Sequence, residues 1–242
     1  MTNKIIKFSK ALTNKHSEVF DNTIRNIWFN LVNYIINSKY RKSVFLINWL
    51  RTQVSEAKEQ SNLINIAESI PTKKEPDEQI IEILKWVNLN VTYVGDSIKW
   101  NMLEKWQTAQ ETATPTSKLT LTGDCEDMHI LIYVLARLKG IPENRMLLWC
   151  GNVQSSPTAY LGGHCSLLYK PQEYPLNFVF IDACYYPNLQ QIFNRTLIFL
   201  DGTSLMEFRK VKDAWITVTS KYKYTWFVFN ERFSTTKYTL KP

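Results

Sequence analysis

The chain has 242 residues, of which 45% are hydrophobic and 21% charged, and its formal net charge is +7. This composition is typical of a globular protein with a large core and excludes a mostly disordered one. No apolar run approaches the roughly 20 residues that span a bilayer, and residues 1–13 lack the apolar stretch of a signal peptide, so we expect a cytoplasmic protein without a membrane partner. The lysines are scattered along the chain, so we do not expect a nucleic-acid partner.

Two helical patterns open the chain. Apolar residues recur at helical spacing over residues 8–38 and again from Val44 to Ala57, and neither stretch contains Pro or Gly. Residues 59–76, which include two prolines, are expected to form a connection. We therefore predict a helical N-terminal layer at residues 1–70 and a core with C-terminal strands at residues 71–242.

The next helix is predicted to begin at Pro76, because proline suits the first helical position and acids follow it at the positive end of the helix dipole. A short extended segment lies at residues 91–94. Further on, Thr122-Gly123-Asp124-Cys125-Glu126-Asp127 runs into an apolar series that stops at Gly140. This pattern predicts a buried helix with Asp124 as its N-cap and Cys125 in its first turn.

Beyond Gly140 the pattern changes to short apolar runs between turn residues, which predicts an antiparallel sheet. The segment 189–199 fits a helix or a strand equally well. Taken together, the patterns predict an α+β protein in which the Cys125 helix packs on the sheet. The runs predicted as strands are residues 146–150, 164–169, 178–181, 214–218 and 224–229.

Cys125 is the candidate nucleophile. Unpaired N–H groups and the positive dipole at a helix start favour a thiolate and can stabilise an oxyanion. Glu126 and Asp127 oppose the thiolate, so the sulfur needs a cationic partner. The remaining cysteines lie in apolar stretches and are interpreted as buried hydrophobic residues. A zinc site is not expected, because the candidate ligands lack the paired spacing of structural zinc modules; these candidates are Cys150, His164, Cys165 and Cys184.

Three histidines are candidates for the base. His16 lies in a polar stretch and is interpreted as a surface residue, and His129, one helical turn after Cys125, as a packed core residue. His164 follows two glycines and opens a predicted strand. Asp182 ends the next apolar run and is the candidate that orients the imidazole. We therefore predict that Cys125, His164 and Asp182 meet across a helix–sheet cleft.

These residues resemble transglutaminase-like cysteine peptidases. The segment from Gly123 to Asp127, with the helix after it and Lys139-Gly140-Ile141-Pro142, is similar to the nucleophile segment of that family. Gly163-His164 and Phe180-Ile181-Asp182-Ala183 are similar to its histidine and aspartate strands. Asp96 and the stretch from Trp106 to Glu111 resemble the segment that precedes the cysteine in the bacterial branch. The resemblance covers roughly residues 76–186.

The resemblance implies a papain-like core, a Cys125–His164–Asp182 triad, and acyl transfer from an amide of a protein or peptide substrate through a thioester. It implies no metal and no organic cofactor. The backbone N–H of Cys125 would supply one oxyanion donor, and Trp106 or Gln107 the second. Water as the acceptor would give hydrolysis, and an amine would give cross-linking.

The alternative hypothesis is a structural protein that retains this fold without turnover. The Asn-, Lys- and Ile-rich composition and the aromatic C-terminal tail suit a component that packs against protein partners in a larger assembly, such as a viral particle. The exposure of Cys125 distinguishes the two hypotheses, since an enzyme must admit substrate to the sulfur.

Overall fold

The computed structural model describes residues 44–116, 120–154, 162–173, 178–184, 197–200, 205–211, 214–217, 222–232 and 234–235. The chain divides into two compact units, Met1–Lys42 and Ser43–Pro242, and every described residue belongs to the second. The helix predicted at residues 8–38 and His16 therefore lie outside the described residues. The domain boundary expected at residue 70 stays a prediction.

The helices of the N-terminal half lie close to the predicted positions, with one correction. Residues 59–76 were predicted to be a connection, but they contain the helix α4, because Leu63, Ala67 and Ile70 recur at helical spacing and are buried. The next helix begins with Pro76, as predicted. The described helices are α3 (Val44–Ala57), α4 (Ser61–Ser69), α5 (Pro76–Asn90), α6 (Asp96–Lys99), α7 (Ala109–Thr112) and α8 (Cys125–Leu138), with a 3₁₀ turn at Glu143–Arg145.

Three sheets contain the described strands. The largest has the order β10-β9-β3-β4-β5 and is antiparallel throughout; β6, β7 and β8 form a second antiparallel sheet, and β1 pairs with β2 in parallel. The strands are β1 (Val91–Tyr93), β2 (Leu121–Gly123), β3 (Met146–Val153), β4 (Gly162–Tyr169), β5 (Val179–Ile181), β6 (Leu197–Leu200), β7 (Leu205–Val211), β8 (Ala214–Thr217), β9 (Tyr222–Phe229) and β10 (Ser234–Thr235). The predicted α+β class, with an antiparallel sheet, is confirmed.

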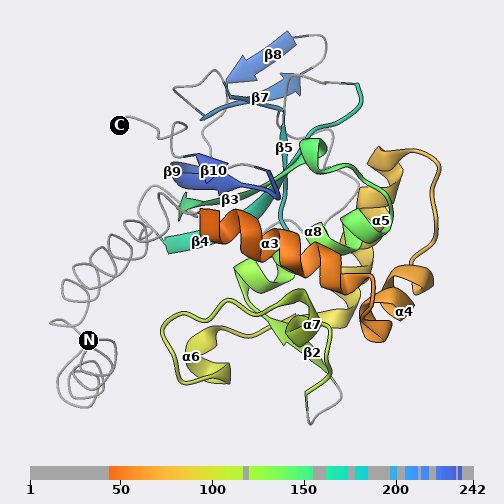
Figure 1. Ribbon diagram of the computed structural model, residues 1–242. Coiled ribbons are helices and arrows are strands. Elements are labelled where there is room, and N and C mark those ends of the chain that lie inside the picture. The colour runs from red at the N-terminus through yellow and green to blue at the C-terminus, as the bar shows by residue number, and fades with distance from the viewer. Residues whose placement is uncertain are drawn as a thin grey trace, which may run out of the picture. The chain divides into compact units, whose positions relative to one another are not determined.

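Helix α8 lies at the centre of the core (Figure 1). Its residues from Glu126 to Ala136 are all buried, as expected for a helix that is covered on every side. It contacts β3 and β4 of the large sheet and also α3, α4, α5 and α7. The helix ends at Leu138, and Gly140 adopts a φ of +84°, a left-handed conformation that glycine tolerates best.

The approach to α8 explains the glycine of the Cys125 motif. β2 pairs with β1 and leads directly into α8, so that Gly123 lies opposite Tyr93. A Cβ atom on residue 123 would lie 2.7 Å from the Cβ of Asp127, which is closer than two carbon atoms can approach. Only glycine therefore lets the strand pass this close to the first turn of the helix.

Among the described residues, no helix has the length and apolar character needed to cross a membrane.

Candidate active site

Cys125 is the first residue of α8, and Asp124 is its N-cap, as predicted. The Asp124 backbone N–H donates to the Asp127 carboxylate at 3.3 Å. The Cys125 thiol is only partly exposed and donates to Glu126 Oε2 at 3.1 Å. Burial, together with the charge of Glu126, raises the pKa of this thiol well above its ordinary value. The sulfur is therefore a thiol in this environment and needs a base in order to react.

His164 and Asp182 form a hydrogen-bonded pair. His164 lies on β4 and Asp182 directly follows β5, and the His164 Nε2 atom is 2.8 Å from Asp182 Oδ2. Burial alone would raise the pKa of Asp182, but the hydrogen bond from His164, the positive charge of that imidazole when it is protonated, and the hydroxyl of Tyr222 hold this pKa well below its usual range. An ionised carboxylate only accepts, so neutral His164 carries its proton on Nε2 and its lone pair on Nδ1.

His129 connects the start of α8 to the turn after β5. The backbone N–H of Ala183 donates to His129 Nε2 at 3.0 Å, so Nε2 carries the lone pair and Nδ1 donates its proton to the Cys125 carbonyl at 2.5 Å. The ring is fully buried, and this burial lowers its pKa to about 4. His129 is therefore neutral and structural, in agreement with its interpretation as a packed core residue.

His129, which is hydrogen-bonded to the Cys125 carbonyl, also lies close to the His164–Asp182 pair. Its ring centre lies 6.0 Å from that of His164, and its Nε2 atom is 4.0 Å from Asp182 Oδ1. The thiols of Cys165 and Cys184, which neighbour His164 and Asp182 in sequence, also raise the pKa of Cys125. The three predicted catalytic residues thus belong to one neighbourhood, while their action as a triad stays a prediction.

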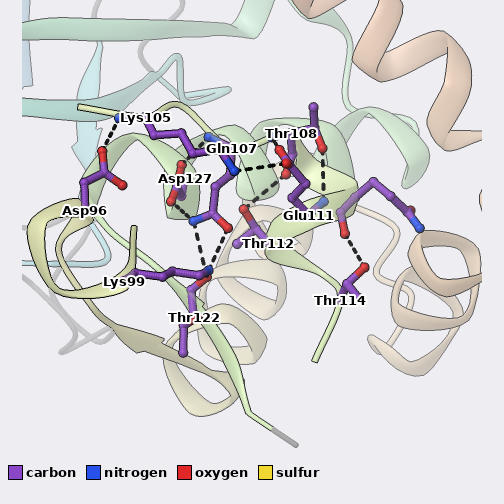
Figure 2. A network of polar contacts seen from close by, with 11 residues as sticks. Asp96, Lys99, Lys105, Gln107, Thr108, Glu111, Thr112, Thr114, Thr122 and Asp127 are labelled. Carbon is purple, nitrogen blue, oxygen red and sulfur yellow. Dashed lines mark hydrogen bonds and ion pairs between the residues drawn. The ribbon is translucent and has the colours of Figure 1, made fainter. Parts of the chain in front are cut away.

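The two oxyanion candidates make hydrogen bonds to acidic residues, and Figure 2 shows those of Gln107 to Asp127. The backbone N–H of Gln107 donates to Asp127 at 2.7 Å, its side-chain amide also donates to Asp127, and its Oε1 atom accepts from Lys99 at 2.7 Å. The indole N–H of Trp106 donates to Glu104 at 2.8 Å. Either group would have to leave its present acceptor in order to bind an oxyanion, so the choice of second donor stays a prediction.

Two of the other three cysteines lie in the core. Cys150 and Cys165 lie opposite each other on β3 and β4 and are buried, in agreement with their interpretation as small hydrophobic residues. Cys184 is partly exposed, so its interpretation as a buried residue was wrong. All four cysteines are free thiols. Among the described residues, none of them belongs to a cluster that could hold a metal ion.

A cluster of three acids beside Cys125 was not predicted from the sequence. One carboxylate oxygen from each of Asp96, Asp124 and Glu126 lies within 4.8 Å of the others, and the three residues are only 4%, 8% and 3% exposed. Asp96 begins α6, three residues after the end of β1, the strand that pairs with β2. The β1–β2 pairing therefore brings it to the start of α8, and adjacency in the sequence could not reveal this.

The hydrogen bonding of the acidic cluster is incomplete. One oxygen of each acid (Asp96 Oδ1, Asp124 Oδ1 and Glu126 Oε1) is buried with no hydrogen-bond partner in the described part of the chain. Burial raises the pKa of all three carboxyls, that of Asp124 to about 7. Buried carboxylate oxygens without partners are costly. Their oxygen-only donor set fits a hard divalent cation such as Ca²⁺.

Comparison with known proteins gives a weak structural likeness. No family model matches the chain, and no curated protein matches it. Among solved structures, LapG of Legionella pneumophila is similar, with 14% identity and a TM-score of 0.44 over 77% of this chain and 87% of LapG. The calcium-bound form of LapG gives a TM-score of 0.46 over 81% and 90% of the two chains, at the same identity. Likeness at this level assigns neither a family nor an activity.

Proposed function

We propose that the chain is a cysteine-nucleophile peptidase or amidase of the transglutaminase-like type, acting on protein or peptide substrates. The observation that carries this proposal is the His164–Asp182 hydrogen bond of 2.8 Å, in a buried neighbourhood that His129 joins to the backbone of Cys125. This arrangement supports the proposed roles of Cys125 as a nucleophile at a helix start, His164 as a base in a fixed tautomer, and Asp182 as the ionised carboxylate behind the base.

In the proposed reaction, the Cys125 sulfur attacks the carbonyl carbon of an amide while its proton passes to Nδ1 of His164. The Asp182 carboxylate stabilises the imidazolium that forms. His164 then gives the proton to the departing amine, and a thioester remains on Cys125. A water molecule, deprotonated by His164, attacks the thioester and releases the acid and the free thiol. An amine in place of water would give a new amide.

Because burial and Glu126 favour the neutral thiol, proton transfer to His164 accompanies the attack rather than preceding it. The developing oxyanion would be stabilised by the backbone N–H of Cys125. This group lies at the N-terminus of α8, where N–H groups have no partner within the helix and the dipole is positive.

The proposal is tested by the reactivity of each cysteine toward iodoacetamide at neutral pH, followed by peptide mass spectrometry, with and without excess Ca²⁺. Cys125 is expected to react at least about tenfold faster than Cys150, Cys165 and Cys184 when His164 is present, because His164 would take the thiol proton as the sulfur attacks the reagent. The preference should disappear in His164→Ala.

Ser166→Ala is the matched control, because Ser166 is also buried on β4 and donates to the Ile181 carbonyl at 3.0 Å, next to Asp182. It should retain the fast labelling of Cys125. Equal labelling of all four cysteines in the wild type, under both conditions, would contradict the proposal and favour the assembly-protein alternative.

We also propose that Asp96, Asp124 and Glu126 bind a divalent cation. The three unpartnered buried oxygens support this assignment. This proposal departs from the sequence prediction, which included no metal site, and the proposed cation takes no part in the chemical step. It would neutralise buried charge and hold α6 against the first turn of α8, while the protein's own side chains carry out the reaction.

Thermal unfolding with added Ca²⁺ checks the cation site. A ligand at a hundredfold excess over its Kd stabilises a protein by about 2.7 kcal/mol, which corresponds to a rise in Tm of roughly 5–10 °C for a chain of this size. Asp96→Asn should abolish the rise, because it removes a ligand charge. Glu59→Gln changes the net charge equally at an exposed position and should retain it. Equal Tm values with Ca²⁺, Mg²⁺, Mn²⁺ and chelator would contradict the site.

A further inference from the structure

The carboxylate of Asp182 accepts hydrogen bonds from three directions. Its Oδ1 atom accepts from the backbone N–H of Cys184 at 2.9 Å. Its Oδ2 atom accepts from His164 Nε2 at 2.8 Å and from the hydroxyl of Tyr222 at 2.6 Å. The two bonds to Oδ2 occupy the two lone pairs of that oxygen, so together they fix how the carboxylate is turned toward the imidazole.

The Tyr222 hydroxyl is itself held in place by aromatic packing. The side chain is buried, and its ring stacks on Phe180 with centroids 3.6 Å apart and planes at 14°. The Trp149 ring meets it edge-on at 5.4 Å, and Trp149 is anchored by its own hydrogen bond to Thr225 at 2.8 Å. A buried ring confined by two neighbours has little freedom to rotate its hydroxyl away from Asp182.

The position of Tyr222 depends on an irregularity of the sheet. Tyr222 is the first residue of β9 and lies opposite Val153, and the β3–β9 pairing shifts register twice before this point is reached. Bulges of this kind commonly redirect side chains beside functional sites. In the large sheet, β3 and β4 lie between β9 and β5. Even so, the hydroxyl of Tyr222 on β9 donates to Asp182, which follows β5.

We propose that Tyr222 is a positioning residue for the reaction, acting through Asp182. This inference rests on the proposed function. Its hydroxyl orients the carboxylate so that one lone pair of Oδ2 faces His164 Nε2, and it keeps the negative charge on Asp182 when His164 becomes an imidazolium. The proton therefore stays on His164, available for the leaving amine, instead of passing to the carboxylate.

The hydroxyl can be separated from the packing by substitution. Tyr222→Phe retains the ring that stacks on Phe180 and contacts Trp149, and removes only the donor. Tyr169→Phe is the matched control, because Tyr169 is another buried tyrosine whose hydroxyl donates to an aspartate, Asp77, at 2.7 Å. Both variants lose a tyrosine–carboxylate hydrogen bond, but only one of these bonds belongs to the proposed site.

The experiment measures the tautomer of the His164 imidazole and the ¹H resonance of its Nε2–H group by NMR, which requires no substrate. Without the Tyr222 donor, the charge of Asp182 is less compensated and the hydrogen bond from His164 Nε2 becomes stronger, so this proton resonance should move downfield. Among the described residues, the titratable groups near this pair include His129 from α8, Cys184 after β5 and Tyr222 itself. Of these, only Tyr222 changes in the variant, and Tyr169→Phe should leave the His164 resonance unaltered.

A second variant gives a change of opposite sign. With 3,5-difluorotyrosine at position 222 the ring and hydroxyl remain but the hydroxyl is a stronger donor, so the Nε2–H resonance of His164 should move upfield. This variant keeps the shape of the side chain and is informative even if Tyr222→Phe does not fold. An unchanged His164 resonance and tautomer in the folded variants would overturn the proposal, since a purely structural tyrosine would alter stability alone.

Activity then separates this inference from the proposed function. On a peptide library, Tyr222→Phe should lower kcat/KM about tenfold, the effect of one hydrogen bond to a charged group. Hydrolysis that is unaffected by Tyr222→Phe would overturn the positioning role while leaving the proposed function standing. A wild type without hydrolysis would overturn the proposed function, and the NMR comparison would still decide whether Tyr222 positions the pair.

Discussion

Cys125→Ala is expected to abolish amide-bond hydrolysis, with a loss of at least about 10³-fold, because no other group at the start of α8 can form the thioester. The fold should persist. The bond between the Cys125 carbonyl and His129 involves only the backbone of residue 125, and the thiol is only partly buried. Digestion of a peptide library, read by mass spectrometry, measures the activity, and thermal unfolding measures the fold.

Cys184→Ala is the control for this substitution. Cys184 is also partly exposed and lies two residues after Asp182, to which it donates through its backbone N–H, a bond that alanine retains. Its substitution should leave hydrolysis within about twofold of the wild type, since its side chain has no part in the proposed reaction. Peptide cleavage that survives in Cys125→Ala would falsify the assignment of the nucleophile.

Asp182→Asn is expected to lower kcat/KM by roughly 10³- to 10⁴-fold, as for the loss of the carboxylate in other triads. An asparagine can present an N–H to His164, which favours the tautomer with its proton on Nδ1 and leaves no base at that nitrogen. It also removes the charge that stabilises the imidazolium. Hydrolysis of the same peptides measures the loss, and ¹⁵N NMR of His164 should show the changed tautomer.

The pH dependence of stability provides a second measurement for Asp182→Asn. The folded-state pKa of Asp182 is depressed, so its stabilising effect is present above the unfolded-state pKa of about 4 and is lost as the pH falls toward the folded value. The wild type should therefore lose more stability than the variant between neutral and strongly acidic pH, as measured by denaturant unfolding.

Asp77→Asn tests whether these effects are specific. The Asp77 carboxylate likewise accepts from a tyrosine hydroxyl and a backbone N–H, from Tyr169 at 2.7 Å and Gln172 at 2.9 Å, but it belongs to α5. This variant should lose stability without losing hydrolysis. Equal losses of activity in Asp77→Asn and Asp182→Asn would point to a general loss of structure and contradict the orienting role.

Local sequence patterns predicted much of the framework. Asp124 was predicted as the N-cap, α8 as a buried helix and β3, β4 and β5 as strands, because capping residues, apolar periodicity and turn residues act over a few positions. Helix α4 was missed, because Pro71 and Pro76 suggested a loop. The three buried residues Leu63, Ala67 and Ile70, which precede both prolines, stabilise the helix by packing against other parts of the chain.

The contacts around the candidate site depended on segments far apart in the sequence. The β1–β2 pairing brings Asp96 to the acids beside Cys125, and the shifted pairing of β9 brings the Tyr222 hydroxyl to Asp182. The sequence by itself determined which residues could act as nucleophile, base and orienter, because this depends on residue type and local geometry. Only the tertiary structure decided their partners and charges, because burial and hydrogen bonding depend on how distant segments pack together.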